Sequence, residues 1–160
     1  MSPRAAWRLE ALGFGPVYDY VAGKVDWLAH GLPREGTRAA VPRAGDLLDT
    51  EPPTCAPGEE LATAAASVEH SRYGFCLVVN EQRIVLGRLR RSALRHAGDN
   101  ATVESVMEPG PSTVRPNVRL SELEQRLEQQ NLRTALVTTP EGRLLGVFAR
   151  AAAEDRLGAG

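Results

Sequence analysis

The fold of this chain is decided by two matching stretches, FCLVVNEQRIVLGRLRR at residues 75–91 and TALVTTPEGRLLGVFAR at residues 134–150. Gly87 in the first stretch aligns with Gly146 in the second, an offset of 59 residues (146 minus 87). Residues 54–91 and 113–150 are therefore two copies of one unit, the first copy and the second copy. The same offset aligns, without a gap, Thr54 with Thr113, Pro57 with Pro116, Leu61 with Leu120, Glu69 with Glu128 and Arg91 with Arg150.

An internal repeat fixes the architecture of a chain, because each copy is expected to fold in the same way. A unit of this size buries too little surface to be stable by itself. We therefore expect the two copies to pack on a shared apolar face. Such a pair has a pseudo-twofold axis and leaves two clefts between its copies.

The composition is that of an ordinary globular protein. The 160 residues are 42% hydrophobic and 24% charged, which fits one compact domain with an appendage. The net charge of −1 argues against a general nucleic-acid binder. No apolar run approaches the roughly 18 residues that span a membrane, and the first residues lack the apolar core of a signal peptide. We therefore expect a cytoplasmic protein that binds neither nucleic acid nor membrane.

Each copy predicts the order strand, helix, strand, strand, helix. In the first copy, residues 59–70 predict a helix, residues 75–79 and 84–89 predict a hairpin, and residues 91–96 predict a short helix. The helix places one apolar face on the core, formed by residues at helical spacing, namely Leu61, Ala64, Ala65 and Val68.

The second copy repeats this order. After an extended segment at residues 112–116, Asn117 is the expected N-cap of a helix. Its buried stripe is Leu120, Leu123 and Leu127. Strands at residues 135–138 and 144–148 are joined by a Pro-Glu-Gly turn, and a last helix is expected over residues 150–154.

Residues 1–40 lie outside the repeat and form an appendage with a linker. Residues 17–21 predict a short strand, and a helical turn is expected around Trp27 and Leu28. Residues 34–42 are polar and small, as in a linker, and residues 46–48 predict a first helical turn.

The order, the length and the strand ending Leu-Gly-Val-Phe-Ala-Arg at residues 145–150 resemble the cystathionine-β-synthase (CBS) domain, which occurs in tandem pairs called Bateman modules. The openings Thr54-Cys55-Ala56-Pro57 and Thr113-Val114-Arg115-Pro116 carry the family's Thr-x-x-Pro pattern. The resemblance implies an α/β fold of two pseudo-symmetric β-α-β-β-α units behind a strand-turn-helix appendage. Its expected parts are the appendage at 1–40, CBS domain 1 at 41–99, CBS domain 2 at 100–155 and a tail at 156–160.

Modules of this family commonly bind adenosine compounds in the cleft between copies and regulate an attached or partner protein. The family's threonine falls on Arg90 and Ala149, and its ribose-binding aspartate falls on Ala93 and Ala152. Guanidinium groups at a strand-to-helix junction suit a phosphate, although arginines there are also compatible with a solvated surface. The residues that the resemblance implies for ligand binding are Thr54, Cys55, Ala56, Arg90, Arg91, Thr113, Val114 and Arg150.

Residues 10–36 resemble, over a short stretch, the C-terminal end of a rhodanese domain, without its preceding core. A sulfurtransferase role for Cys55 is disfavoured, because Glu59 and Glu60 raise the pKa of a nearby thiol. The three histidines lack metal-ligand spacing. We therefore expect no enzyme, no metal and no cofactor, and we interpret Cys55 and Cys76 as reduced thiols.

Two functions remain open. The first is a non-catalytic regulatory module that senses a small anion, with an adenine nucleotide as a candidate. The second is a ligand-free dimerisation or protein-docking module. In both cases we expect a homodimer, and the protein partner is unknown.

Overall fold

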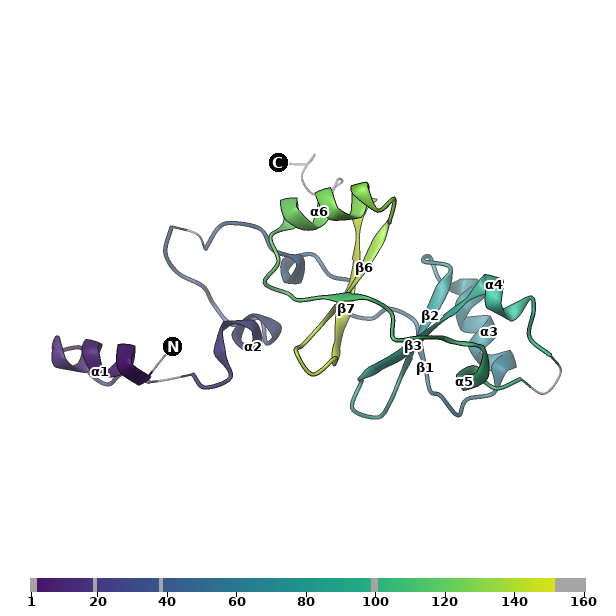
Figure 1. Cartoon of the computed structure of the whole chain (residues 1–160), viewed down its shortest axis with the longest axis horizontal. Coiled ribbons are helices and arrows are strands. Elements are labelled where there is room, and N and C mark those ends of the chain that lie inside the picture. The colour runs from purple at the N-terminus through teal and green to yellow at the C-terminus, as the bar shows by residue number, and fades with distance from the viewer. Residues whose placement is uncertain (1–2, 19, 38, 99–100, 152–160) are drawn as a thin grey trace.

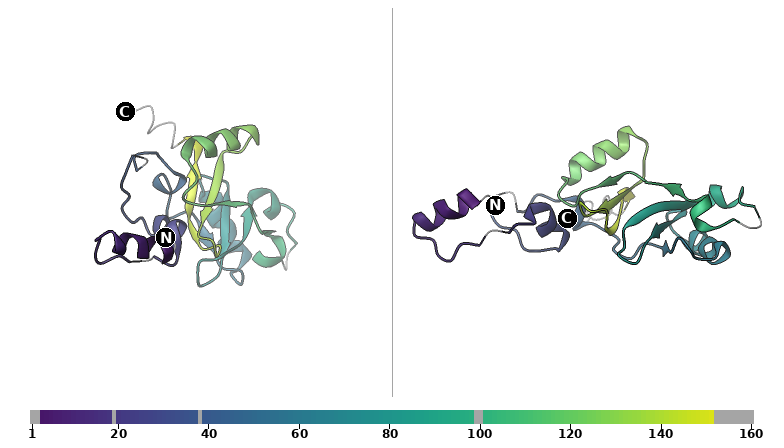
Figure 2. Two further views of the ribbon diagram at one scale, coloured as in Figure 1. Left: turned by 60° about the vertical axis from the view of Figure 1, so that its left-hand side comes forward. Right: turned by 60° about the horizontal axis from the view of Figure 1, so that its bottom comes forward.

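The computed structural model describes residues 3–18, 20–37, 39–98 and 101–151. Two α/β units lie side by side, and an N-terminal segment extends away from them (Figures 1 and 2). That segment contains helices α1 (Pro3–Ala11) and α2 (Gly23–Ala29). Within the described residues, no helix has both the length and the apolar character needed to cross a membrane.

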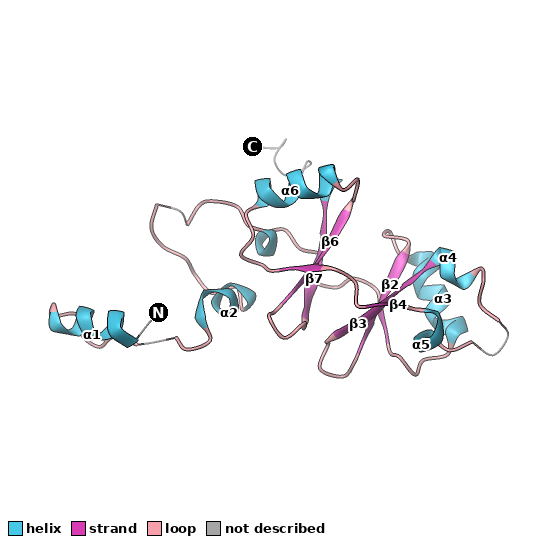
Figure 3. Cartoon of the chain, in the orientation of Figure 1, coloured by secondary structure: helices cyan, strands magenta, loops and turns pink. Residues whose placement is uncertain are grey.

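The first copy supplies three strands of a four-stranded sheet with the strand order β1-β2-β3-β4, and the segment that follows this copy supplies β4 (Figure 3). Strand β1 runs parallel to β2, and the other pairs are antiparallel. The elements are, in chain order, β1 (Thr54–Cys55), α3 (Leu61–His70), β2 (Phe75–Val79), β3 (Val85–Arg90), α4 (Arg91–Leu94), α5 (Val103–Val106) and β4 (Glu108–Pro109).

The second copy repeats the first residue by residue. Its elements are β5 (Thr113–Val114), α6 (Leu120–Gln129), β6 (Thr134–Thr138) and β7 (Leu144–Ala149), and each lies 59 residues after its counterpart. The strand pairing is also the same, because Thr54 opposite Leu77 becomes Thr113 opposite Leu136. The repeat and the predicted order of elements are confirmed over the described residues, and the final helix is seen only at residues 150–151.

The helices bury the stripes that the sequence predicts. Leu120, Leu123 and Leu127 of α6 are at most 4% exposed and pack with Val137 and Phe148 of the sheet. In α3, Ala64 and Val68 are fully buried, whereas Leu61 and Ala65 of the predicted stripe are half-buried. Burial of one apolar face is what holds such short helices in place, since helices of this length are marginal in water.

Asn117 is not the N-cap of α6, contrary to the sequence prediction. The helix begins at Leu120, after the extended residue Arg119. Asn117 instead lies in a turn that follows Pro116 and is closed by a hydrogen bond from the Val118 N–H to the Arg115 carbonyl (3.2 Å). The helical turn predicted at residues 46–48 also lies earlier, as a 3-10 turn at Ala44–Asp46.

The segment that precedes each copy packs on the other copy. Residues 42–49 lie against the second copy, where the Ala44 N–H donates to the Val118 carbonyl (2.8 Å) and Asp49 pairs with Val147. Residues 101–108 are their counterparts at the same offset and lie against the first copy, with Val103 fully buried in its core. We call residues 42–49 and 101–108 the exchanged segments.

The repeated glycines make room for the exchanged segments. A Cβ atom on Gly87 would lie 2.9 Å from Met107 Cγ, and one on Gly146 would lie 3.1 Å from Leu48 Cβ. Both distances are too short for ordinary carbon–carbon contact. The two hairpin positions of the repeat therefore require glycine, because an exchanged segment of the same chain crosses the strand there.

The two copies join through their hairpins. The Val85 N–H donates to the Gly142 carbonyl (3.1 Å), and the Leu144 N–H donates to the Arg83 carbonyl (2.8 Å). These two bonds are counterparts under the repeat, so the pseudo-twofold axis passes between them. Behind them lies a shared apolar core of Phe75, Leu77, Leu136, Leu144 and Val147.

The N-terminal segment differs from its prediction. Residues 17, 18, 20 and 21 form no strand, and Asp19 lies outside the described residues. A strand needs a partner for its backbone groups, and in the part of the chain that the structure describes neither sheet includes this segment, whose Val21 is 93% exposed. Helix α1 was not expected, and helix α2 replaces the turn around Trp27. The resemblance of this segment to a rhodanese domain stays a prediction.

Candidate functional site

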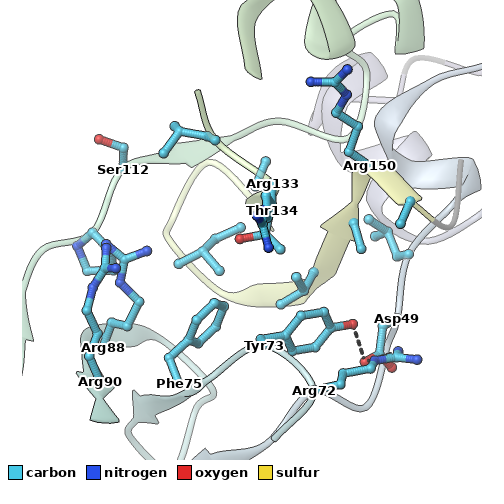
Figure 4. A pocket seen from close by; sticks show the side chains of 18 of the residues that line it. Asp49, Arg72, Tyr73, Phe75, Arg88, Arg90, Ser112, Arg133, Thr134 and Arg150 are labelled. Carbon is cyan, nitrogen blue, oxygen red and sulfur yellow. Dashed lines mark hydrogen bonds and ion pairs between the residues drawn. The ribbon is translucent and has the colours of Figure 1, made fainter. Parts of the chain in front are cut away.

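A cleft of about 1150 Å³ lies where the two copies meet (Figure 4). Its walls contain pairs of residues that are counterparts under the repeat, so the cleft lies across the pseudo-twofold axis. The pairs are Asp49 with Glu108, Arg72 with Asn131, Tyr73 with Leu132, Phe75 with Thr134, Arg88 with Val147 and Arg90 with Ala149.

The cleft is strongly basic compared with the rest of the chain. The described lining residues include two carboxylates, Asp49 and Glu108, and five arginines, which leaves a net formal charge of +3. The whole chain carries −1. A concave surface with one sign of charge concentrates ions of the opposite sign. The arginines are Arg72, Arg88, Arg90, Arg133 and Arg150.

Side chains at the start of β2 and on β3 form a continuous stack along the first-copy side of the cleft. Tyr73 and Phe75 stack with ring centres 5.5 Å apart. The Arg72 guanidinium lies 5.0 Å from the Tyr73 ring centre, and the Arg88 guanidinium lies 5.6 Å from that of Phe75. Each guanidinium is within the distance at which a cation is attracted to a ring face. The stack therefore holds four side chains in fixed positions.

A carboxylate from an exchanged segment binds each end of this stack. Asp49 accepts a hydrogen bond from the Tyr73 hydroxyl (2.7 Å) and forms an ion pair with Arg72. Glu108 accepts from Arg88 (3.0 Å) and from Arg90 (2.9 Å). Since Asp49 and Glu108 are counterparts under the repeat, the same position of both exchanged segments supplies the acid.

The pKa shifts follow from these contacts. Hydrogen bonds from Arg88 and then Arg90 lower the pKa of Glu108. Burial raises the pKa of Asp49, but hydrogen bonds from Tyr73 and Arg72 outweigh it, so that the pKa is lowered. Burial, followed by the hydrogen bond to Asp49, raises the pKa of Tyr73 to about 12. Both carboxylates are therefore ionised and Tyr73 is neutral near pH 7.

The structure brings two of the eight sequence-predicted site residues into this cleft, Arg90 and Arg150. Arg91 instead donates to the Glu69 carbonyl at the end of α3 (3.2 Å). The other five, which lie on or beside β1 and β5, do not line the cleft; they are Thr54, Cys55, Ala56, Thr113 and Val114.

Cys55 and Cys76 belong to the core of the first copy. Cys55 is 4% exposed and Cys76 is fully buried. The pKa of Cys76 is raised, by its hydrogen bond with Cys55 and then by burial. A buried thiol with a raised pKa is a poor nucleophile. The pKa of Cys55 is instead lowered, because its hydrogen bond with Cys76 outweighs burial and the charge of Glu59, so the raised pKa expected from the sequence is wrong. The burial of both thiols is in line with the structural role that the sequence suggested.

Sequence reasoning missed several residues of the cleft, chiefly Asp49, Tyr73, Glu108 and Arg133. The signal was present for two of them. Extending the repeat upstream to residue 42 aligns Asp49 with Glu108, and an acid retained at both positions would have indicated a shared role.

Comparison with known proteins relates the second copy to a family model. Residues 103–152 match the family model of the CBS domain. No curated protein sequence matches the chain. The chain therefore contains a CBS domain that covers its second copy, as the resemblance implied.

Solved structures give the fold of the pair. The soluble part of a magnesium transporter superposes with a TM-score of 0.62 at 15% identity, over 73% of this chain and 48% of that one. The CBS domain pair of protein MJ0100 in complex with 5′-methylthioadenosine and S-adenosyl-L-methionine gives 0.61 at 16%, over 74% and 98%. CBSX2 in complex with AMP gives 0.63 at 17%, over 74% and 98%.

The chain spans about half the length of the magnesium transporter structure that it matches. It spans nearly all of the two CBS structures. Its fold is that of a tandem CBS domain pair with a short N-terminal helical appendage, which confirms the α/β fold class that the resemblance implied.

Proposed function

We propose that this protein is a non-catalytic regulatory module that binds a small anion in the cleft between its two CBS units. The observation that carries the proposal is the excess of three positive charges in a cleft at the pseudo-twofold axis. An adenine nucleotide is the first candidate, because two structures of similar fold are complexes with AMP and with adenosine derivatives. We place the protein in the cytoplasm.

Binding at this cleft is expected to depend on phosphate more than on the nucleoside. The position of the family's ribose-binding aspartate holds Ala93 in the first copy. The Tyr73 ring is already contacted by the Arg72 guanidinium and by the Phe75 ring. A base would have to compete with these contacts, whereas guanidinium groups bind phosphate through strong charge-assisted hydrogen bonds.

The chemistry of the lining supports a binding role. The described lining residues contain three hydroxyls, on Ser112, Thr134 and Tyr73, and no thiol or imidazole. The Tyr73 hydroxyl donates to Asp49, but its pKa of about 12 keeps it protonated near pH 7, which makes it a weak nucleophile. Nucleophilic catalysis needs a nucleophile within hydrogen-bond reach of a base. We therefore propose that the cleft recognises its ligand without transforming it.

Titration calorimetry of the full chain with ATP, AMP and adenosine tests the proposed function. We expect ATP to bind more tightly than AMP, and AMP more tightly than adenosine. Raising the salt concentration should weaken all phosphate binding, because charges in an open cleft are screened. Absence of heat with all three compounds would remove the basis of the proposal.

A protein-docking module is the second candidate, and the N-terminal segment favours it. Trp7, Leu12, Phe14 and Tyr18 are all more than 60% exposed. Clustered apolar side chains on a surface mark interaction sites.

We propose that this segment contributes to a homodimer. Sedimentation of the parent and of the double variant Trp7→Ser, Phe14→Ser should show a dimer and a monomer respectively, and a monomeric parent would exclude this role.

A further inference from the structure

We infer that the anionic group of the ligand binds at Arg133, on the second-copy side of the cleft, and that this group is a phosphate or pyrophosphate. The inference rests on the proposed function and identifies the residue that anchors the ligand. It differs from the sequence interpretation, which placed the phosphate at Arg90 and Arg91.

The first-copy arginines already hold anionic partners. Arg72 is paired with Asp49, and Arg88 and Arg90 share Glu108 at 3.0 and 2.9 Å. An incoming phosphate at these guanidiniums would have to displace a carboxylate and would then lie next to it. A phosphate and a carboxylate that lie side by side repel each other. The first-copy side of the cleft is therefore the poorer anion site.

The lining residues that belong to the second copy itself come from residues 131–136 and 147–151 and include Arg133 and Arg150 but no acid. Asp49 lies against this copy through its backbone, but its carboxylate binds Arg72 and Tyr73 of the first copy. Arg150 lies 3.6 Å from Glu128, a carboxylate that is 71% exposed and outside the cleft lining. Among the described residues Arg133 forms no ion pair. Arg133 is exposed and lines the cleft, so no carboxylate competes for its donors.

The repeat shows that Arg133 is a cation found in one copy only. Its counterpart in the first copy is Gly74, whereas the counterpart of Arg150 is Arg91. The backbone is the same in both copies, because the Arg91 N–H donates to the Gly74 carbonyl (3.4 Å) and the Arg150 N–H donates to the Arg133 carbonyl (3.0 Å). Two arginines thus occupy directly paired positions at one end of the β6–β7 hairpin.

Arg150 has Glu128 as a partner, so Arg133 is the cation at this end of the hairpin that a bound oxyanion would neutralise. Opposite charges at short range attract most strongly where water is partly excluded, as in a concave cleft. Two lining residues supply hydroxyl donors, Thr134, which follows Arg133 in the sequence, and Ser112. In Figure 4, Arg133 and Thr134 lie at the centre of the cleft, between Arg150 on one side and Arg88 with Arg90 on the other. A planar guanidinium beside a hydroxyl matches the geometry of a phosphate group.

Calorimetry of the full chain with inorganic pyrophosphate and with ATP tests the assignment. We expect Arg133→Gln to weaken both probes by about tenfold, the effect of losing one charge-assisted contact. Arg126→Gln, on the exposed face of α6 and outside the cleft lining, is the matched control and should bind as the parent does. Arg90→Gln should have a smaller effect than Arg133→Gln, because Glu108 already binds Arg90.

The outcomes separate this inference from the proposed function. If the parent binds both probes and Arg133→Gln binds them equally well, the anchor lies elsewhere and only the inference fails. A larger loss in Arg90→Gln than in Arg133→Gln would return the phosphate to the first-copy side. If the parent binds neither probe, both the inference and the proposed anion-binding function fail. Arg133 is exposed, so its variant is expected to fold, and circular dichroism checks this.

Discussion

At the scale of single residues, the cleft is governed by which arginines have an acid beside them. The sequence shows five arginines between residues 83 and 95 without an intervening acid, and this run suggested an anion site. Only the folded chain brings Glu108 to Arg88 and Arg90. The acid is supplied by a segment that lies about twenty residues later, and local sequence patterns carry no information about such pairing.

Replacing Glu108 should therefore strengthen anion binding. Glu108→Gln removes one negative charge next to two guanidiniums and frees their donors. A unit charge at about 4 Å in water is worth about 1 kcal/mol, so we expect ATP to bind about fivefold more tightly. Glu104→Gln on the same exchanged segment, exposed and outside the cleft lining, is the control. Calorimetry decides, and unchanged or weaker binding would show that Glu108 does not compete with the ligand.

Tyr73 should make stability sensitive to alkaline pH. Its pKa is raised to about 12 from the ordinary value of 10.0, so its contribution is complete below pH 10.0 and is lost as the pH rises through about 12. We expect urea midpoints to fall between about pH 9 and 11.5 by more in the parent than in Tyr73→Phe. Tyr18→Phe, at an 80% exposed position, should follow the parent. Equal declines in all three proteins would contradict the role of Tyr73.

At the scale of elements, the sequence predicts what is local and misses what is contributed by other parts of the chain. The strands at residues 75–79 and 134–138 follow from short apolar runs, and the helix stripes follow from helical spacing. The strand expected at residues 17–21 fails because, among the described residues, no other strand pairs with this segment. The sequence did not predict the exchanged segments, because their short turns are stabilised by contacts with the opposite copy. Such tertiary contacts leave no hydrophobic periodicity in the local sequence.

The close packing of the exchanged segment 42–49 on strand β7 can be tested by substituting Gly146. A Cβ atom in Gly146→Ala would lie 3.1 Å from both Leu48 Cβ and the carbonyl carbon of Asp49, so the segment must shift. We expect a loss of about 1–3 kcal/mol in the free energy of unfolding, as for other overpacked sites. Gly58→Ala, which meets nothing within 4 Å, serves as the control. Chemical denaturation measures both, and a fully stable Gly146→Ala would argue against close packing at this crossing.

At the scale of the whole molecule, the exchanged segments and the hairpin bonds make the two copies depend on each other. Val103 is fully buried in the first-copy core, with Val106 and Met107 beside it, although all three precede the second copy in sequence. Ala44 is buried likewise in the core of the second copy. A cut between the copies therefore removes core residues from each, and the pair should unfold as one cooperative unit.

This dependence predicts the behaviour of fragments. A fragment of residues 41–99 follows the sequence boundary of the first CBS unit but lacks Val103, Val106 and Met107. Each buried apolar side chain contributes on the order of 2 kcal/mol, so the loss approaches the 5–15 kcal/mol that typically holds a domain together. We expect this fragment to be unfolded alone by circular dichroism and to regain structure when mixed with residues 100–160. A fragment of residues 50–112, which keeps α5 and β4, should retain more structure by itself. If residues 41–99 fold alone as stably as residues 50–112, the exchanged segments contribute little, and the copies are independent domains that only touch.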